Sequence, residues 1–117
     1  MSDNLYKYSL STHKPQEFIS ITDLAAQAAR DSEIKNGMAL IYCPHTTAGI
    51  TINENIDPNV VKDMIGTLDK IFPVHGDYRH IEGNSHAHIK ASVIGASCTV
   101  IISDGSIMLG TWQGIFF

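Results

Sequence analysis

The apolar residues of this 117-residue chain follow two different spacings, and this mixture constrains the fold more than any single motif does. Several short runs alternate apolar and polar residues, a period of two that is typical of half-buried strands. One longer stretch repeats apolar residues every three or four positions, which is typical of an amphipathic helix. The strand-like runs outnumber the helical ones and do not alternate strictly with them. The pattern therefore predicts an α+β fold, and the length predicts one domain over residues 1–117.

The strand-like runs are short and are separated by turn residues. Asp104-Gly105 is a hairpin turn signal between two of them. The predicted strands cover residues 5–10, 17–22, 38–43, 46–53, 86–94, 98–103 and 107–111.

Two helices are predicted from cap residues and periodicity. Thr22 can cap the first, which runs through Ile34. Asp57-Pro58 starts the second, because Asp caps well and Pro fits the first helical position. Apolar residues at helical spacing continue from there, and the helix should stop before Pro73. The polar residues 73–84 are predicted to form a loop, and loops of this length in small domains are usually functional or disordered.

Charge and composition exclude several classes of protein. The net charge is −4 without a basic block, so the field of the molecule would repel nucleic acid. No run of 18 apolar residues is present, and the first residues carry no apolar signal segment, so we expect a cytoplasmic protein with no membrane contact. Cys43 and Cys98 lie in apolar runs and are expected to be reduced core thiols.

Histidines are concentrated in two segments. Four of the six lie between His75 and His88, and His45 opens another polar segment. Imidazole is the commonest metal ligand in proteins and titrates near neutral pH. His45, His80 and His88 together would give the three protein ligands of an open site for a divalent metal, zinc or magnesium. A surface pair at positions 86 and 88, or a capping role for His45, is the structural alternative.

Other polar residues could bind an anion beside these histidines. On a strand over residues 86–94, Lys90 and Ser92 would share a face with the imidazoles. Glu54 could orient an imidazole or bind a hard cation, whereas Asn55 and Asp57 also suit turn and cap chemistry.

Four segments in combination resemble the YjbQ-like family, also called the secondary thiamine-phosphate synthase family. They are His45-Thr-Thr-Ala-Gly-Ile-Thr-Ile-Asn-Glu-Asn-Ile-Asp57-Pro58, His80-Ile-Glu82-Gly-Asn84, His88-Ile-Lys90-Ala-Ser92 and Gly110-Thr-Trp-Gln113-Gly114-Ile. The resemblance implies a compact α+β domain with a mixed, strongly curved sheet, packed by two main helices and assembled as a homotrimer. Members of this family normally continue past the Gly-Ile-Phe-Phe segment into an acidic tail, which we expect to be missing after Phe117.

The resemblance also implies a weak, secondary thiamine-phosphate synthase activity. This transferase reaction joins a hydroxymethylpyrimidine diphosphate to a thiazole phosphate and releases pyrophosphate. His45, His80 and His88 would hold a metal or transfer protons, and Glu82 would orient an imidazole. The residues that match the family as substrate or phosphate ligands are Asn53, Glu54, Lys90, Ser92 and Gln113. The alternative is a non-catalytic trimeric module that binds a small anion or a metal.

These residues are predicted to meet in one pocket close to a subunit boundary. A lysine buried there without a partner would be costly, so an anion should lie near Lys90. Glu54 and a bound phosphate are the two candidates for that anion.

Overall fold

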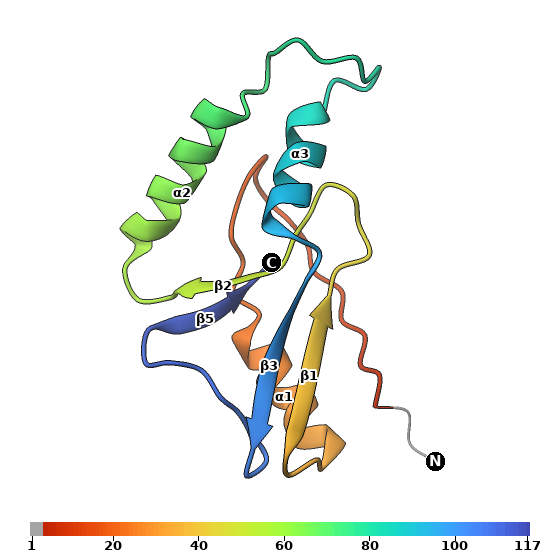
Figure 1. Ribbon diagram of the computed structural model, residues 1–117, viewed down its shortest axis with the longest axis vertical. Helices are drawn as coiled ribbons and strands as arrows, with labels where there is room; N and C mark the ends of the chain where they lie inside the picture. Colours follow the sequence, from red (N-terminus) through yellow and green to blue (C-terminus); the bar gives the residue numbers. More distant parts are fainter. Residues whose placement is uncertain (1–3) are drawn as a thin grey trace.

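Three helices and five short strands make up the part of the chain that the computed structural model describes, residues 4–117 (Figure 1). This small α+β domain confirms the predicted fold class. The elements in chain order are α1 (Thr22–Ser32), β1 (Gly37–Tyr42), β2 (Thr51–Glu54), α2 (Pro58–Ile71), α3 (Ser85–Ile94), β3 (Ser97–Ser103), β4 (Ser106–Ile107) and β5 (Gln113–Phe116).

The strands form two small sheets, one with the order β1-β3-β4 and the other with the pair β2-β5. Each pairing between the described strands is antiparallel. The expectation of a mixed sheet was therefore wrong for these strands. In the first sheet Tyr42 lies opposite Ser97, and in the second Glu54 lies opposite Gln113. The predicted hairpin at Asp104-Gly105 is confirmed, with φ of 50° and 80° at its two residues.

The predicted strand over residues 17–22 runs along β5 but pairs with it only briefly. Ile19 N–H donates to Phe117 O at 2.7 Å, and Ile21 N–H donates to Ile115 O at 2.8 Å. The prediction that Thr22 caps α1 was wrong. Its hydroxyl instead accepts a hydrogen bond from Ile115 N–H at 2.9 Å. This threonine instead fastens the start of the helix to the second sheet.

Helix α2 follows its sequence signals closely. Asp57 is the N-cap, its carboxylate accepts from Asn59 N–H at 2.9 Å, and Pro58 is the first helical residue. The helix ends at Ile71, before Pro73 as predicted. Helix α1 ends at Ser32 rather than Ile34, because Glu33 adopts a left-handed conformation with φ of 59°.

The prediction of a strand over residues 86–94 was wrong, because this segment is helix α3. Alternation over so few residues also fits a helix, and Ala87, Lys90 and Ala91 all have good helix propensity. Glycine at position 95, with φ of 98°, ends the helix. The helical geometry changes which side chains of this segment lie together, since neighbours are now three or four residues apart.

Other strand predictions were wrong in length or position. Residues 5–10 form no strand, and the run 46–53 is reduced to β2. The run 107–111 leaves the sheet at Ile107, whereas the next strand, β5, was not predicted.

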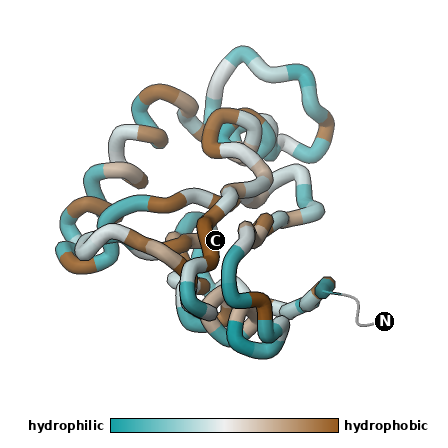
Figure 2. The backbone as a smooth tube through the Cα atoms, turned by 60° about the horizontal axis from the view of Figure 1, so that its bottom comes forward, coloured by the Kyte–Doolittle hydropathy of each residue, from teal (hydrophilic) through white to brown (hydrophobic). Residues whose placement is uncertain are grey.

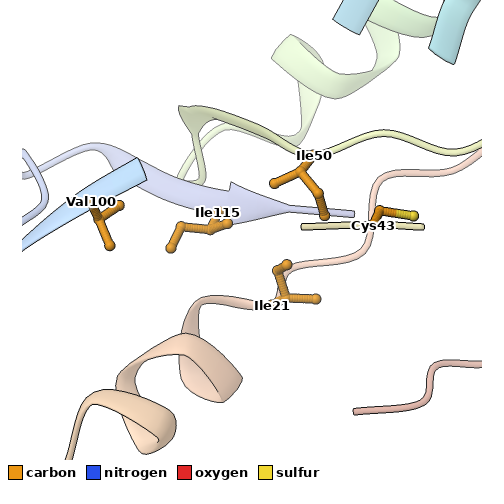
Figure 3. Close-up of a cluster of buried hydrophobic side chains, with 5 residues drawn as sticks. All are labelled: Ile21, Cys43, Ile50, Val100 and Ile115. Carbon is orange, nitrogen blue, oxygen red and sulfur yellow. The ribbon is translucent and has the colours of Figure 1, made fainter. Parts of the chain in front are cut away.

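The core is small and lies where the two sheets and α1 meet (Figure 3). Its buried cluster consists of Ile21, Cys43, Ile50, Val100 and Ile115. Cys43 is buried and Cys98 half-buried, and both are free thiols as predicted. Burial raises the pKa of the Cys98 thiol, so it is a poor nucleophile.

The described chain is more extended than the compact domain that was expected. Its radius of gyration is 15.9 Å, whereas a compact domain of this length has about 13 Å. Figure 2 shows hydrophobic stretches on helices and strands throughout the molecule rather than at its centre alone. Large apolar side chains such as Leu5, Met38 and Ile81 are exposed, so much apolar surface lies outside the core.

Candidate functional site

Two predicted site residues, His80 and His88, lie against each other at the start of α3. Their ring centroids are 5.1 Å apart and their planes are nearly perpendicular, at 88°. His80 is exposed in the turn before the helix, and His88 is half-buried in its second turn. The turn between them closes with a hydrogen bond from Gly83 N–H to His80 O at 3.2 Å. Two imidazoles at this separation can share one metal ion or pass a proton.

The imidazole pair is not completed by a third ligand from the same chain. Among residues 4–117, no group of three His, Cys, Asp or Glu side chains is placed to hold a metal ion. His45 is exposed in the loop after β1, and Glu82 is exposed in the turn that follows His80. The donor set therefore fits a divalent metal only in part, with two ligands of the three that an open site needs.

Lys90 is the one charged residue that is buried in the described chain, with 7 % of its surface exposed. Its Nζ donates to Asp69 Oδ1 at 2.6 Å and to Gln16 Oε1 at 2.7 Å. Gln16 Nε2 also donates to the same Asp69 oxygen at 2.6 Å. The carboxylate predicted near Lys90 is thus Asp69 of α2, not Glu54. This network joins α2, α3 and the N-terminal segment.

The network lowers the pKa of its carboxylate, Asp69. The hydrogen bond from Lys90 is the largest cause, and the hydrogen bond from Gln16 is the second. A neighbouring His86 adds a smaller contribution of the same sign. At neutral pH Asp69 is therefore ionised, and Lys90 is already engaged by protein atoms.

The helix also separates residues that the predicted strand would have placed on one face. His88 and Ser92 are four apart on α3, and the Ser92 hydroxyl donates to His88 O at 3.1 Å. Lys90 lies between them in sequence and points instead toward α2, where it meets Asp69. The prediction that His88, Lys90 and Ser92 share a face was wrong for this reason.

Asn53 and Glu54 lie on β2 and Gln113 on β5, the two paired strands of the second sheet. Glu54 lies opposite Gln113 in the register, and Asn53 lies opposite Gly114. The amide oxygen of Gln113 accepts from Gly110 N–H at 2.8 Å, which folds the turn beside it.

Glu54 also lines a groove of about 470 Å³ beside the start of α2. Its lining includes Phe18 and Phe116, whose rings pack edge to face at 6.0 Å. Lys14 and Lys62 also line it.

The residues predicted to share one pocket thus fall into separate places of a single chain. Figure 1 places the ends of β2 and β5 in a different part of the molecule from the start of α3. Sequence reasoning missed Asp69 and Gln16, the partners of Lys90. Asp69 lies on α2 with no distinguishing motif, so only its ion pair with Lys90 in the folded chain identifies it.

A family model described as UPF0047 protein YjbQ-like matches residues 6–117. The chain is 53% identical over 113 residues to a UPF0047 protein of Methanocaldococcus jannaschii, covering 97% of this chain and 82% of that one. It is 52% identical over 109 residues to the UPF0047 protein YugU of Bacillus subtilis, covering 92% and 83% of the two chains.

Solved structures agree with the sequence matches. A crystal structure of a conserved YjbQ/UPF0047 protein from Clostridium acetobutylicum superimposes with a TM-score of 0.95 at 57% identity, covering 97% of this chain and 88% of that one. A YjbQ-like protein from Sulfolobus solfataricus gives a TM-score of 0.88 at 34% identity, covering 92% and 78%. Among the described residues, no helix has the length and apolar character needed to cross a membrane.

Proposed function

This chain belongs to the UPF0047 YjbQ-like family, and on that premise we propose that it is a homotrimeric transferase of the thiamine-phosphate synthase type. It acts in the cytoplasm on a small phosphorylated molecule. The observation that carries the proposal is the pair of imidazoles at His80 and His88. Such a pair, at the start of a helix and beside a turn, with His80 exposed and His88 half-buried, is suited to metal binding or proton transfer.

His80 and His88 would hold a divalent metal, and imidazole ligands favour zinc over magnesium. When bound, the ion supplies a Lewis acid that polarises a phosphate oxygen. Glu82 orients an imidazole from the turn. The remaining ligand comes from outside the chain, because residues 4–117 offer no group of three.

Substrate contacts are assigned to the open end of the second sheet, to Asn53, Glu54 and Gln113. The groove at Glu54 has a volume within the range of small-molecule sites, roughly 300–1,000 Å³. Ser92 lies on the helix face of His88, so it is assigned to the imidazole pair rather than to the groove. Lys90 is given a positioning role, since Asp69 and Gln16 occupy its ammonium group.

A turnover assay tests the proposed reaction. Purified protein is incubated with hydroxymethylpyrimidine diphosphate, thiazole phosphate and zinc or magnesium, and released pyrophosphate is measured. We expect slow turnover that disappears in His80→Ala and persists in His13→Ala, since His13 lies far along the chain in the N-terminal segment. Equal rates in both variants would exclude the imidazole pair from the reaction.

The second candidate is a non-catalytic trimeric module that binds a small anion or a metal. The shallow, open character of the site favours it, because both imidazoles lie near the surface and His80 is exposed. Stoichiometric metal binding without any release of pyrophosphate would support this candidate over the transferase.

A further inference from the structure

The groove at the start of α2 is lined by apolar side chains from separate segments of the chain. Val61 and Ile65 line it from α2, where they lie one helical turn apart, and both are half-buried. Phe18 lines it from the segment before α1 and is also half-buried. Its ring packs edge to face against that of Phe116, which is only 5% exposed. A supported aromatic ring and an aliphatic pair suit a flat, ring-shaped ligand.

The segment before α1 is fixed in place by its own hydrogen bonds. The Glu17 carboxylate accepts from His13 N–H at 2.6 Å and from Lys14 N–H at 2.9 Å, which closes the turn. The next anchor is Gln16, whose amide oxygen accepts from Lys90 Nζ at 2.7 Å. This side of the groove is therefore formed before a ligand arrives, and binding loses little conformational freedom there.

The groove is lined by charges of both signs, of which only some are free for a ligand. Two of its three carboxylates already accept backbone N–H groups, Glu17 in the turn and Asp57 at the first turn of α2. Between residues 4 and 117, no ion pair engages the ammonium groups of Lys14 and Lys62, and no hydrogen bond engages the Glu54 carboxylate. One acceptor and two cations are thus left for a ligand.

These free groups indicate the chemistry of the ligand. A carboxylate accepts strongly from an amino group, and ammonium groups favour an anion such as phosphate. Together with the apolar lining, they suit a heteroaromatic ring that carries both an amino group and a phosphate. Of the two substrates of the proposed reaction, the hydroxymethylpyrimidine diphosphate has such an amino group, whereas the thiazole phosphate has none.

We infer that this groove binds an amino-substituted heteroaromatic phosphate, with the ring between Phe18 and the aliphatic pair of α2. The amino group donates to Glu54, and Lys14 and Lys62 hold the phosphate. The inference rests on the proposed function for the identity of the ligand as the aminopyrimidine substrate.

The assignment also gives the phosphate a cation that is free to bind it. Lys90, which the sequence suggested for this role, is occupied by Asp69 and Gln16. The groove lies beside β2 and the start of α2, in a different part of the molecule from the imidazole pair at the start of α3 (Figure 1). Binding in the groove should therefore need no metal.

Titration calorimetry in the presence of EDTA tests the ligand class on the wild-type protein. The probes are hydroxymethylpyrimidine monophosphate and the analogue in which a carbonyl oxygen replaces its amino group. We expect the amino compound to bind at least about tenfold more tightly, because the analogue leaves Glu54 without a donor. Equal affinities for the two compounds would overturn the inference, and this comparison needs no variant.

Variants then test the individual contacts. Glu54→Gln should abolish the preference between the two compounds, since an amide can serve either group. Lys14→Gln and Lys62→Gln should each weaken both compounds by about two- to fivefold. Lys7→Gln, at an exposed lysine outside the groove, is the matched control and should leave both affinities unchanged. Equal affinities in Lys7→Gln and Lys14→Gln, with both folded by circular dichroism, would remove the phosphate from these lysines.

Turnover separates the failure of this inference from the failure of the proposed function. Preferential binding of the amino compound without any release of pyrophosphate supports the groove as its binding site and overturns the transferase. Release of pyrophosphate at the wild-type rate in both Glu54→Gln and Lys14→Gln keeps the transferase and overturns the groove assignment.

Discussion

At the scale of single residues, the buried Lys90 is the clearest case of a site residue whose role differs from the one the sequence suggested. Its burial would be costly without a counter-charge, and Asp69 and Gln16 supply the oxygens it needs. The prediction of a partner anion was therefore correct in kind, and its identity was wrong. A lysine on a predicted strand had no reason to meet α2, whereas one on α3 meets it directly.

Asp69→Asn should destabilise the protein at neutral pH, and the loss should shrink in acid. The folded state lowers the pKa of Asp69, so the stabilisation is full above the ordinary carboxyl pKa and disappears as the pH falls through the lowered value. Urea midpoints of wild type and variant should thus converge below about pH 4. Asp63→Asn, an exposed carboxylate on the same helix, is the control and should track wild type throughout. If the difference in urea midpoint between wild type and Asp69→Asn stayed constant with pH, the charge of Asp69 would not be what stabilises the fold.

His80→Ala and His88→Ala should each reduce bound zinc to the background level, and His13→Ala should not. The two rings are in contact, so removing either leaves a single imidazole that holds a divalent ion weakly. Elemental analysis of protein purified without a histidine tag measures the content. Undiminished zinc in either variant would place the metal elsewhere.

At the scale of elements, the sequence predicted those segments whose signals are local. Asp57-Pro58 specified the start of α2, and Asp104-Gly105 specified the hairpin between β3 and β4. Helix α3 was missed because its apolar residues alternate with polar ones, as in a strand. Its contact with α2 is an ion pair from Lys90 rather than a stripe of apolar side chains. Periodicity identifies a helix through its apolar stripe, and α3 has none to identify.

Gly114→Ala should weaken the second sheet, and Gly66→Ala should strengthen α2. A Cβ at position 114 would lie 2.7 Å from the Asn55 Cβ, whereas one at position 66 meets nothing within 4 Å. We expect a loss of about 1–3 kcal/mol in the first case from overpacking, and a gain of about 0.5–1 kcal/mol in the second from helix propensity. Urea unfolding measures both. If Gly114→Ala and Gly66→Ala changed the free energy of unfolding equally, the contact between β5 and Asn55 would be able to accept a Cβ without cost, contrary to this prediction.

At the scale of the whole molecule, the chain has less core than its size would allow and more surface than a monomer exposes, 8154 Å² against about 6,300 Å² for a folded monomer of 12.8 kDa. This feature could be anticipated only in part from the sequence, where sparse charge was the one sign of it. The meeting of distant site residues could not be predicted in the same way. It depends on where α2 and α3 lie relative to the sheets, and no short-range pattern determines that placement.

The thermal midpoint should rise with protein concentration. Folding that is coupled to association of copies shifts with mass action, whereas a monomer melts at a fixed temperature. Scanning calorimetry from micromolar to hundred-micromolar chain, with light scattering for the mass at each concentration, tests this. A constant thermal midpoint together with the mass of a single chain would exclude the proposed homotrimer.

The contact between Gly49 and Gly95 sets a limit on how this chain can vary. A Cβ on Gly49 would lie 2.8 Å from Gly95 O, and Gly95 itself has a φ of 98° that other residues rarely adopt. A side chain at position 49 pushes the His45 loop away from the end of α3, whereas one at position 95 meets open space and is strained by its φ. A library of all substitutions should therefore be depleted at both positions. Because these glycines are outside the buried cluster, the depletion should be stronger when the library is selected for zinc binding than when it is selected for folded protein alone.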